Sequence, residues 1–260
     1  MISNKQTTII EGGKQMNSIN TNRQTAALKA SKTKITPSNF IRWTGLSAIV
    51  AGIIFAGIQP FHPADVVESV NTTQFAIILA LKTLMCYLML LGIAGIYARQ
   101  MSKAGWLGLV GFLMLGICWA TQLAYVFAEA FIFPLFTTLA PKYVDGLLGV
   151  SSGRASEVDL GANPALYGLL VGGLYMLGGL VFGIATFRAN ILPRWTTVLL
   201  AGTAALTPLA ALFPHNIQRF AAVPMGLSMA ALGYALWTER RSRTVENVPG
   251  STQLSQTAAE

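Results

Sequence analysis

Charged residues are scarce in this sequence, and their scarcity excludes an ordinary soluble domain. Only 11% of the 260 residues are Asp, Glu, Lys or Arg, and 53% are hydrophobic, whereas soluble domains carry roughly 25% charged residues. The sequence also lacks a phosphate-binding loop, an HExxH helix and a GxSxG elbow, so it offers no nucleotide-binding, zinc-protease or serine-hydrolase motif. Whether the chain is an enzyme is left undecided, with a non-enzyme favoured.

Long apolar runs fill the middle of the chain. Those long enough to cross a bilayer lie at about 41–60, 74–97, 106–134, 164–187, 195–213 and 219–238. A segment that crosses lipid must be helical, because hydrocarbon offers the backbone no hydrogen-bond partners. The sequence therefore predicts an all-α fold, a bundle of six transmembrane helices over residues 41–238, with too little chain left for a second, soluble domain.

The two ends of the chain are polar. Residues 1–40 carry six Lys or Arg among Asn, Gln, Ser and Thr, and contain no aromatic residue before Phe40. Such a segment cannot bury enough apolar surface to fold. We expect disordered cytoplasmic segments at 1–40 and 239–260.

Basic residues sort to one side of the predicted membrane. With the N-terminus in the cytoplasm, fourteen of the eighteen Lys and Arg lie on the cytoplasmic side, and the outer side holds only Lys142, Arg154 and Arg219. This distribution satisfies the positive-inside rule. We expect both termini in the cytoplasm and a multi-pass protein of the cell membrane. The net charge of +8 then reflects orientation in the lipid bilayer and not nucleic-acid binding.

Two ionisable residues, Lys82 and Glu129, lie inside predicted spans, where charge is costly and by default functional. The second and third spans form a hairpin around a short turn near Ser102. Glu129 falls about two helical turns further out than Lys82, roughly 10 Å at 1.5 Å per residue. Because side chains tilt toward the N-terminus of their own helix, Lys82 and Glu129 nevertheless lean toward each other. Gln122 and Tyr125 share the face of Glu129, so the four predict a polar cluster in the outer half of the bilayer. It is either a proton or substrate pathway or a structural pair that fastens the hairpin.

The fourth span is rich in glycine. Gly168 and Gly172, and then Gly179 and Gly183, are each four residues apart. Small residues at this spacing let helices approach closely in lipid. We expect a central packing helix that neighbouring helices approach closely. A membrane-protein partner or a second copy of the chain that docks on this helix is an alternative. A further alternative is that these glycines reflect membrane composition alone.

A long outer connection, about 136–163, contains four glycines: Gly146, Gly149, Gly153 and Gly161. Long loops are disproportionately functional. The alternative is a mobile connector without a role.

Cysteine and histidine are too few to form a recognisable metal motif. Cys86 and Cys118 fall at similar predicted depth, which permits a redox pair, although cysteine in lipid is commonly an inert packing residue. His62 and His215 both follow outward-running spans and are the only candidates for metal or haem ligation. Because no spacing motif accompanies them, we expect no metal and no cofactor.

Three stretches resemble a group of uncharacterised bacterial six-pass integral membrane proteins. They are residues 92–100 (GIAGIYARQ), Glu129-Ala130-Phe131 with Pro134, and Gly183 through Arg188-Ala189 to Leu192-Pro193-Arg194-Trp195. The resemblance covers about residues 40–240. It implies a bacterial origin and the cytoplasmic membrane, and it implies no reaction.

The resulting functional expectation is a transport-like or sensory membrane protein that uses the polar cluster of Lys82, Gln122, Tyr125 and Glu129. One alternative is a redox, metal- or haem-binding subunit that uses the histidines. Another is an accessory or assembly protein that docks a partner through the glycine-rich fourth helix.

Overall fold

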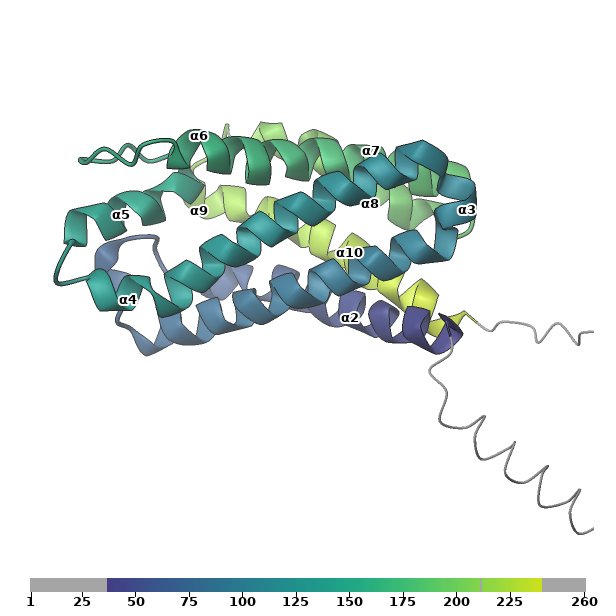
Figure 1. Cartoon of the computed structure of the whole chain (residues 1–260), viewed down its shortest axis with the longest axis horizontal. Helices are drawn as coiled ribbons and strands as arrows, with labels where there is room; N and C mark the ends of the chain where they lie inside the picture. The colour runs from purple at the N-terminus through teal and green to yellow at the C-terminus, as the bar shows by residue number, and fades with distance from the viewer. Residues whose placement is uncertain (1–36, 211, 240–260) are drawn as a thin grey trace, which may run out of the picture.

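The computed structural model describes residues 37–210 and 212–239, and this part of the chain is an elongated bundle of helices without a strand (Figure 1). Most of the two polar ends, residues 1–36 and 240–260, lies outside the described residues. The all-α prediction is therefore correct for the described part of the chain.

The helices follow one another with short connections. In chain order they are α2 (Pro37–Gly57), η1 (Gln59–Phe61), η2 (Val67–Ser69), α3 (Thr73–Phe131), α4 (Phe133–Phe136), α5 (Pro141–Gly149), η3 (Val150–Ser152), α6 (Asn163–Tyr167), η4 (Gly168–Gly173), α7 (Leu174–Ala189), α8 (Arg194–Ala210), α9 (His215–Gln218), η5 (Arg219–Ala221) and α10 (Ala222–Thr238). Four helical segments within the described ranges are long and apolar enough to cross a membrane: Asn39–Gly57, Thr73–Phe131, Asn163–Ala189 and Arg219–Thr238. The fold is thus compatible with a membrane protein.

The longest element, α3, is a helical hairpin. It runs to Gly105, whose backbone angles (φ 57°, ψ −156°) are non-helical, and then returns along the bundle (Figure 1). Such angles are essentially restricted to glycine because a Cβ would clash. The rings of Tyr97 and Phe112 stack across the turn with centroids 4.7 Å apart. Gly105 thus sets the turn between the predicted second and third spans.

The helices pack in a closed ring. α2 contacts α10 and the first arm of α3, the second arm contacts α7, and α8 joins α7 to α10. Glycine lies where backbones come closest: a Cβ on Gly52 of α2 would lie 2.3 Å from the carbonyl oxygen of Gly226 on α10, and one on Gly111 would lie 2.6 Å from the backbone nitrogen of Phe182. Close backbone contact of this kind supplies packing energy where surrounding lipid gives little hydrophobic drive.

One end of the bundle, which we name the terminal end, holds residues 37 and 239 and the Gly105 turn (Figure 1). There the guanidinium of Arg99 donates two hydrogen bonds to the carboxylate of Glu239. Trp43 and Trp106 are 64% and 81% exposed, as expected of indoles at a lipid–water boundary.

The other end, which we name the cap end, is covered by residues 58–72 and 132–162. The connection predicted at 136–163 folds into α5 and η3. Arg154 donates to the carboxylate of Asp145 (2.5 Å) and to the carbonyl oxygen of Asp65 (3.0 Å), and Asp145 accepts from the backbone N–H of Val67 (3.1 Å). Val144 and Leu148 of α5 are buried beneath these contacts. This connection is therefore a folded cap tied to the loop after α2.

Candidate functional site

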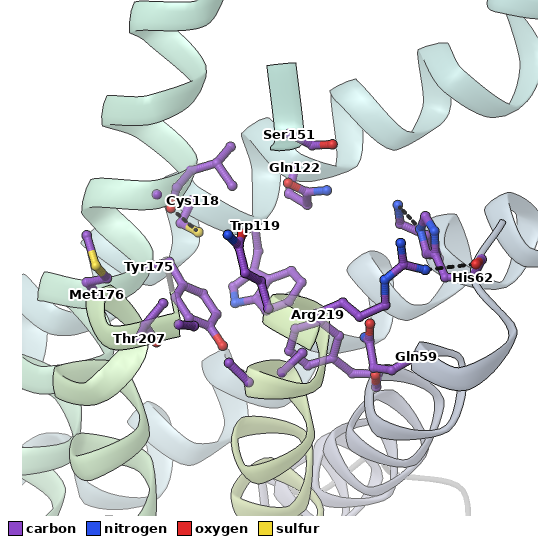
Figure 2. A pocket seen from close by; sticks show the side chains of 18 of the residues that line it. Gln59, His62, Cys118, Trp119, Gln122, Ser151, Tyr175, Met176, Thr207 and Arg219 are labelled. Carbon is purple, nitrogen blue, oxygen red and sulfur yellow. Dashed lines mark hydrogen bonds between the residues drawn. The ribbon is translucent and has the colours of Figure 1, made fainter. Parts of the chain in front are cut away.

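A cavity of about 670 Å³ lies near the cap end, between α2, both arms of α3, the α6–α7 segment, the end of α8 and the start of α10 (Figure 2). Its lining residues are of two chemical kinds. We name the polar ones the polar wall; they include Gln59, His62, Asp65, Lys82, Gln122 and Arg219. We name the apolar ones the apolar wall; they include Phe55, Met85, Trp119, Tyr175, Met176 and Pro208.

His62 is the centre of the polar wall. Its Nε2 lies 3.1 Å from Lys82 Nζ, its Nδ1 lies 2.9 Å from the carbonyl oxygen of Pro63, and its own carbonyl accepts from Arg219 Nη1 at 2.8 Å (Figure 2). An ammonium cannot accept a hydrogen bond, so Nε2 accepts from Lys82 and Nδ1–H donates to Pro63. Burial, followed by the Lys82 charge, lowers the pKa of His62 to about 4. The ring is therefore neutral at pH 7, which this tautomer requires.

Glu129 lies behind Lys82, outside the cavity lining. Its Oε2 is 3.6 Å from Lys82 Nζ, and the residue is 6% exposed. Side-chain tilt predicted that the two residues lean toward each other, and the position of the turn, at Gly105 and not near Ser102, brings them to similar depth. A buried ion pair is sustained only when further hydrogen bonds compensate for lost hydration, and His62 supplies one to Lys82.

Gln122 and Tyr125 complete the predicted polar cluster. Gln122 lines the cavity, and its Oε1 accepts from the hydroxyl of Tyr167 at 3.1 Å. The ring of Tyr125 packs on that of Tyr167 with centroids 4.7 Å apart, and its buried hydroxyl has no hydrogen-bond partner in the described part of the chain. The four predicted residues thus divide, with Lys82 and Gln122 facing the cavity and Tyr125 and Glu129 behind it.

Arg219 is the functional candidate that sequence reasoning missed. In the sequence it is one of the few outer-side charges, and nothing nearby marks it as part of a site. In the structure it begins η5 and reaches across to His62, with its Nε buried and without an acceptor among the described residues. A buried donor without an acceptor costs about 1–3 kcal/mol, so such a group calls for an explanation.

A π-helical turn, η4, forms part of the apolar wall. The wider turn directs the carbonyl oxygen of Val171 toward Cys118, whose Sγ donates to it at 3.5 Å. On the same wall Trp119 packs edge-on against Phe55 and Tyr175, with centroids 5.4 and 6.4 Å away. π-helical turns inside α-helices occur frequently at functional sites.

The four predicted packing glycines lie in two different environments. A Cβ on Gly179 or Gly183 would come within 2.8 Å of Ala204 or Ala201 of α8. A Cβ on Gly168 or Gly172 would meet nothing within 4 Å, and Gly172 lines the cavity. Close helix contact is therefore limited to the second pair.

The cysteines and histidines do not form a metal site in the described residues, where no group of three His, Cys, Asp or Glu could hold an ion. Cys86 and Cys118 are free thiols and both are buried. Both ring nitrogens of His62 are engaged by protein groups, so ligation would require one of these contacts to break. His215 begins α9, and its side chain lies outside the described part.

The arrangement can hold a molecule with one polar end. Hydrogen-bond donors of Lys82 and Arg219 lie on one wall, and aromatic and aliphatic surface faces them (Figure 2). Comparison with known proteins gives no relative from which a ligand could be inferred: no family model, no curated protein and no solved structure matches this chain.

Proposed function

We propose that this protein binds a small amphipathic molecule within the membrane, as the recognition step of a transport-like or sensory function. The cavity with its two unlike walls is the observation that carries the proposal. Its volume of about 670 Å³ falls within the range of about 300–1,000 Å³ typical of small-molecule sites. Such sites combine mostly apolar walls with a few convergent polar groups.

Two of the hydroxyl and thiol groups that line the cavity, those of Cys118 and Ser151, favour binding without covalent catalysis. Cys118 donates to Val171 and Ser151 Oγ donates to the carbonyl oxygen of Leu148. A nucleophile needs a base within hydrogen-bond reach to activate it. These two groups instead face backbone carbonyls, which cannot take a proton.

For the membrane we propose six crossings, with both termini in the cytoplasm of a bacterial cell and the cap end outside. The length of α3 supports two crossings, because an unbroken helix of 59 residues would be about 88 Å long, against a hydrocarbon core of about 30 Å. α8 is shorter, but it lies between α7 and α10 in the ring. Both described ends of the chain lie at the same end of the bundle (Figure 1).

Reporter fusions test this orientation. We expect reporters at residue 155 in the cap and after residue 260 to score on opposite sides of the membrane, with the second one cytoplasmic. A cap reporter on the cytoplasmic side would contradict the orientation.

Two leucine substitutions on one helical turn test the binding proposal. Gly172→Leu adds bulk to the cavity lining, whereas Gly168→Leu adds the same bulk at an exposed position of η4 outside the lining, and neither Cβ meets a neighbour within 4 Å. We expect mass spectrometry of gently purified protein to detect a bound small molecule in the wild type and in Gly168→Leu, but not in Gly172→Leu. Both variants should melt close to the wild type. Equal occupancy of all three would contradict the proposal.

A further inference from the structure

Hydrogen-bond donors outnumber acceptors on the polar wall. Lys82 carries three N–H donors and Arg219 carries five, and neither side chain contains an acceptor atom of its own. Within the chain, Lys82 is met by His62 and Glu129, and Arg219 Nη1 by the His62 carbonyl. Arg219 Nε remains buried without an acceptor among the described residues. A ligand that completes this wall must supply acceptor atoms.

The charges around the cavity favour an anion. Two cationic side chains, Lys82 and Arg219, line it, against one carboxylate, Asp65, whose Oδ1 lies 3.8 Å from His62 Nδ1. Glu129 contacts the far side of Lys82 and does not line the cavity. The side chains that line the cavity therefore carry one more positive than negative charge. Charge-assisted hydrogen bonds to an oxyanion are shorter and stronger than neutral ones.

The opposite wall excludes a wholly polar ligand. Trp119 and Tyr175 lie across the cavity from Arg219 and His62 (Figure 2). Trp119 is 4% exposed and packs against both Phe55 and Tyr175, so the wall is preformed. A phosphate or carboxylate ion alone would leave this apolar surface uncovered.

We infer that the cavity takes an anionic amphiphile, with an acidic oxyanion head between Lys82 and Arg219 and an apolar body against Trp119 and Tyr175. This inference rests on the proposed binding function and names its ligand class. The shared chemistry is a carboxylate or phosphate group on one hydrocarbon chain.

Four probes that share the same hydrocarbon tail, brominated at its end, but differ in head group test this ligand class. They are bromoundecanoate, bromoundecyl phosphate, bromoundecyl trimethylammonium and bromoundecanol. The full chain carries phenylalanine in place of Trp43, Trp106, Trp195 and Trp237, so that bromine quenching reports on Trp119 alone. The protein is reconstituted in nanodiscs of phosphatidylcholine. Saturable quenching that disappears in Gly172→Leu measures binding in the cavity.

We expect the carboxylate or the phosphate probe to bind about ten-fold more tightly than the alcohol, because a charge-assisted hydrogen bond adds roughly that factor. Arg219→Gln should weaken the acidic probe about ten-fold and leave the alcohol within about two-fold. Arg99→Gln is the matched control. Arg99 is an arginine of the terminal end, bonded to Glu239 and absent from the cavity lining, so its loss should change neither affinity.

Each outcome decides between the two proposals. Equal affinity for acid and alcohol, or preference for the trimethylammonium probe, overturns the anionic ligand and leaves binding of an amphiphile intact. Absence of saturable quenching with all four probes overturns both. If Arg219→Gln does not fold, the head-group series on the protein with native Arg219 still decides.

Discussion

In the terminal half of the bundle, α7 lies so close to α8 that a Cβ on Gly179 or Gly183 would come within 2.8 Å of an alanine, whereas in the cap half the same helical segment leaves Gly168 and Gly172 without a neighbour within 4 Å. The residue type is the same, and so is the spacing. What differs is the π-helical turn η4, Gly168–Gly173, which interrupts the α-helical path before α7 begins. The comparison shows that a glycine stripe in a membrane helix serves close packing in one half and leaves space for a cavity in the other.

The two halves also differ in buried polar groups. The terminal half contains Gln100, fully buried, which donates to Thr186 at 2.6 Å. The cap half contains Lys82, Glu129, His62 and Arg219 in direct contact. Charge is expensive in lipid and marks functional positions. We therefore expect the functional positions in the cap half.

The largest expected effect on the free energy of unfolding comes from changes to the ion pair of Lys82 and Glu129. Lys82→Met or Glu129→Gln alone should lower the free energy of unfolding in detergent by about 3 kcal/mol, because each leaves a buried partner uncompensated. The double variant should recover much of that loss, which a double-mutant cycle measures. Strictly additive losses would show that the two residues are independent. If the stable double variant keeps its cellular role, the pair only fastens the hairpin.

The next effect concerns the two glycine environments. Gly179→Leu should lower the free energy of unfolding by about 2 kcal/mol, within the range for overpacking, because α8 must move away. Gly172→Leu should change it by less than about 0.5 kcal/mol, as at sites without packing constraints. Thermal melts of both variants in one detergent make the comparison. Equal losses would mean that the cavity half is packed as tightly as the terminal half.

Acidification should weaken the cap half selectively. The pKa of His62 falls on folding from 6.5 to about 4, so the unfolded chain binds a proton first and stability falls as pH drops through that window. The loss between pH 7 and pH 5 is about 2 kcal/mol at most. His62→Gln retains an acceptor for Lys82. In this variant the free energy of unfolding, measured against pH, should stay nearly constant over this range. A pH dependence equal to that of the wild type would assign the effect to other groups.

The smallest effects are expected at the two partly exposed arginine–carboxylate pairs. Arg154→Gln at the cap end and Arg99→Gln at the terminal end should each cost less than about 1 kcal/mol, as exposed ion pairs usually do. Amide hydrogen exchange should distinguish the two variants. Arg154→Gln should raise the exchange rate only at residues 65–69 and 144–156. Faster exchange at both ends in either variant would show that the two halves open together.

Helix geometry explains how much of the candidate site was predictable. Side-chain tilt predicted that Lys82 and Glu129 lean toward each other. The turn expected near Ser102 left them about 10 Å apart in depth, whereas the turn lies at Gly105, which brings them to similar depth and allows their 3.6 Å approach. The same reasoning put Gln122, Tyr125 and Glu129 on one polar face, but of these three only Gln122 lines the cavity. It could not separate Gly168 and Gly172 from Gly179 and Gly183, because the spacing of each pair is identical and only the π-helical turn distinguishes them.

The sequence by itself determined the all-α character of the described chain, its apolar helices and the existence of the hairpin, because composition and periodicity act within a few residues. It indicated a turn near Ser102, whereas the structure places the turn at Gly105. Only the tertiary structure decided the cavity. Arg219 and His62 are 157 residues apart along the chain, and their contact depends on α10 packing against α2. No local sequence pattern predicts this contact, because it forms only when the whole ring of helices closes.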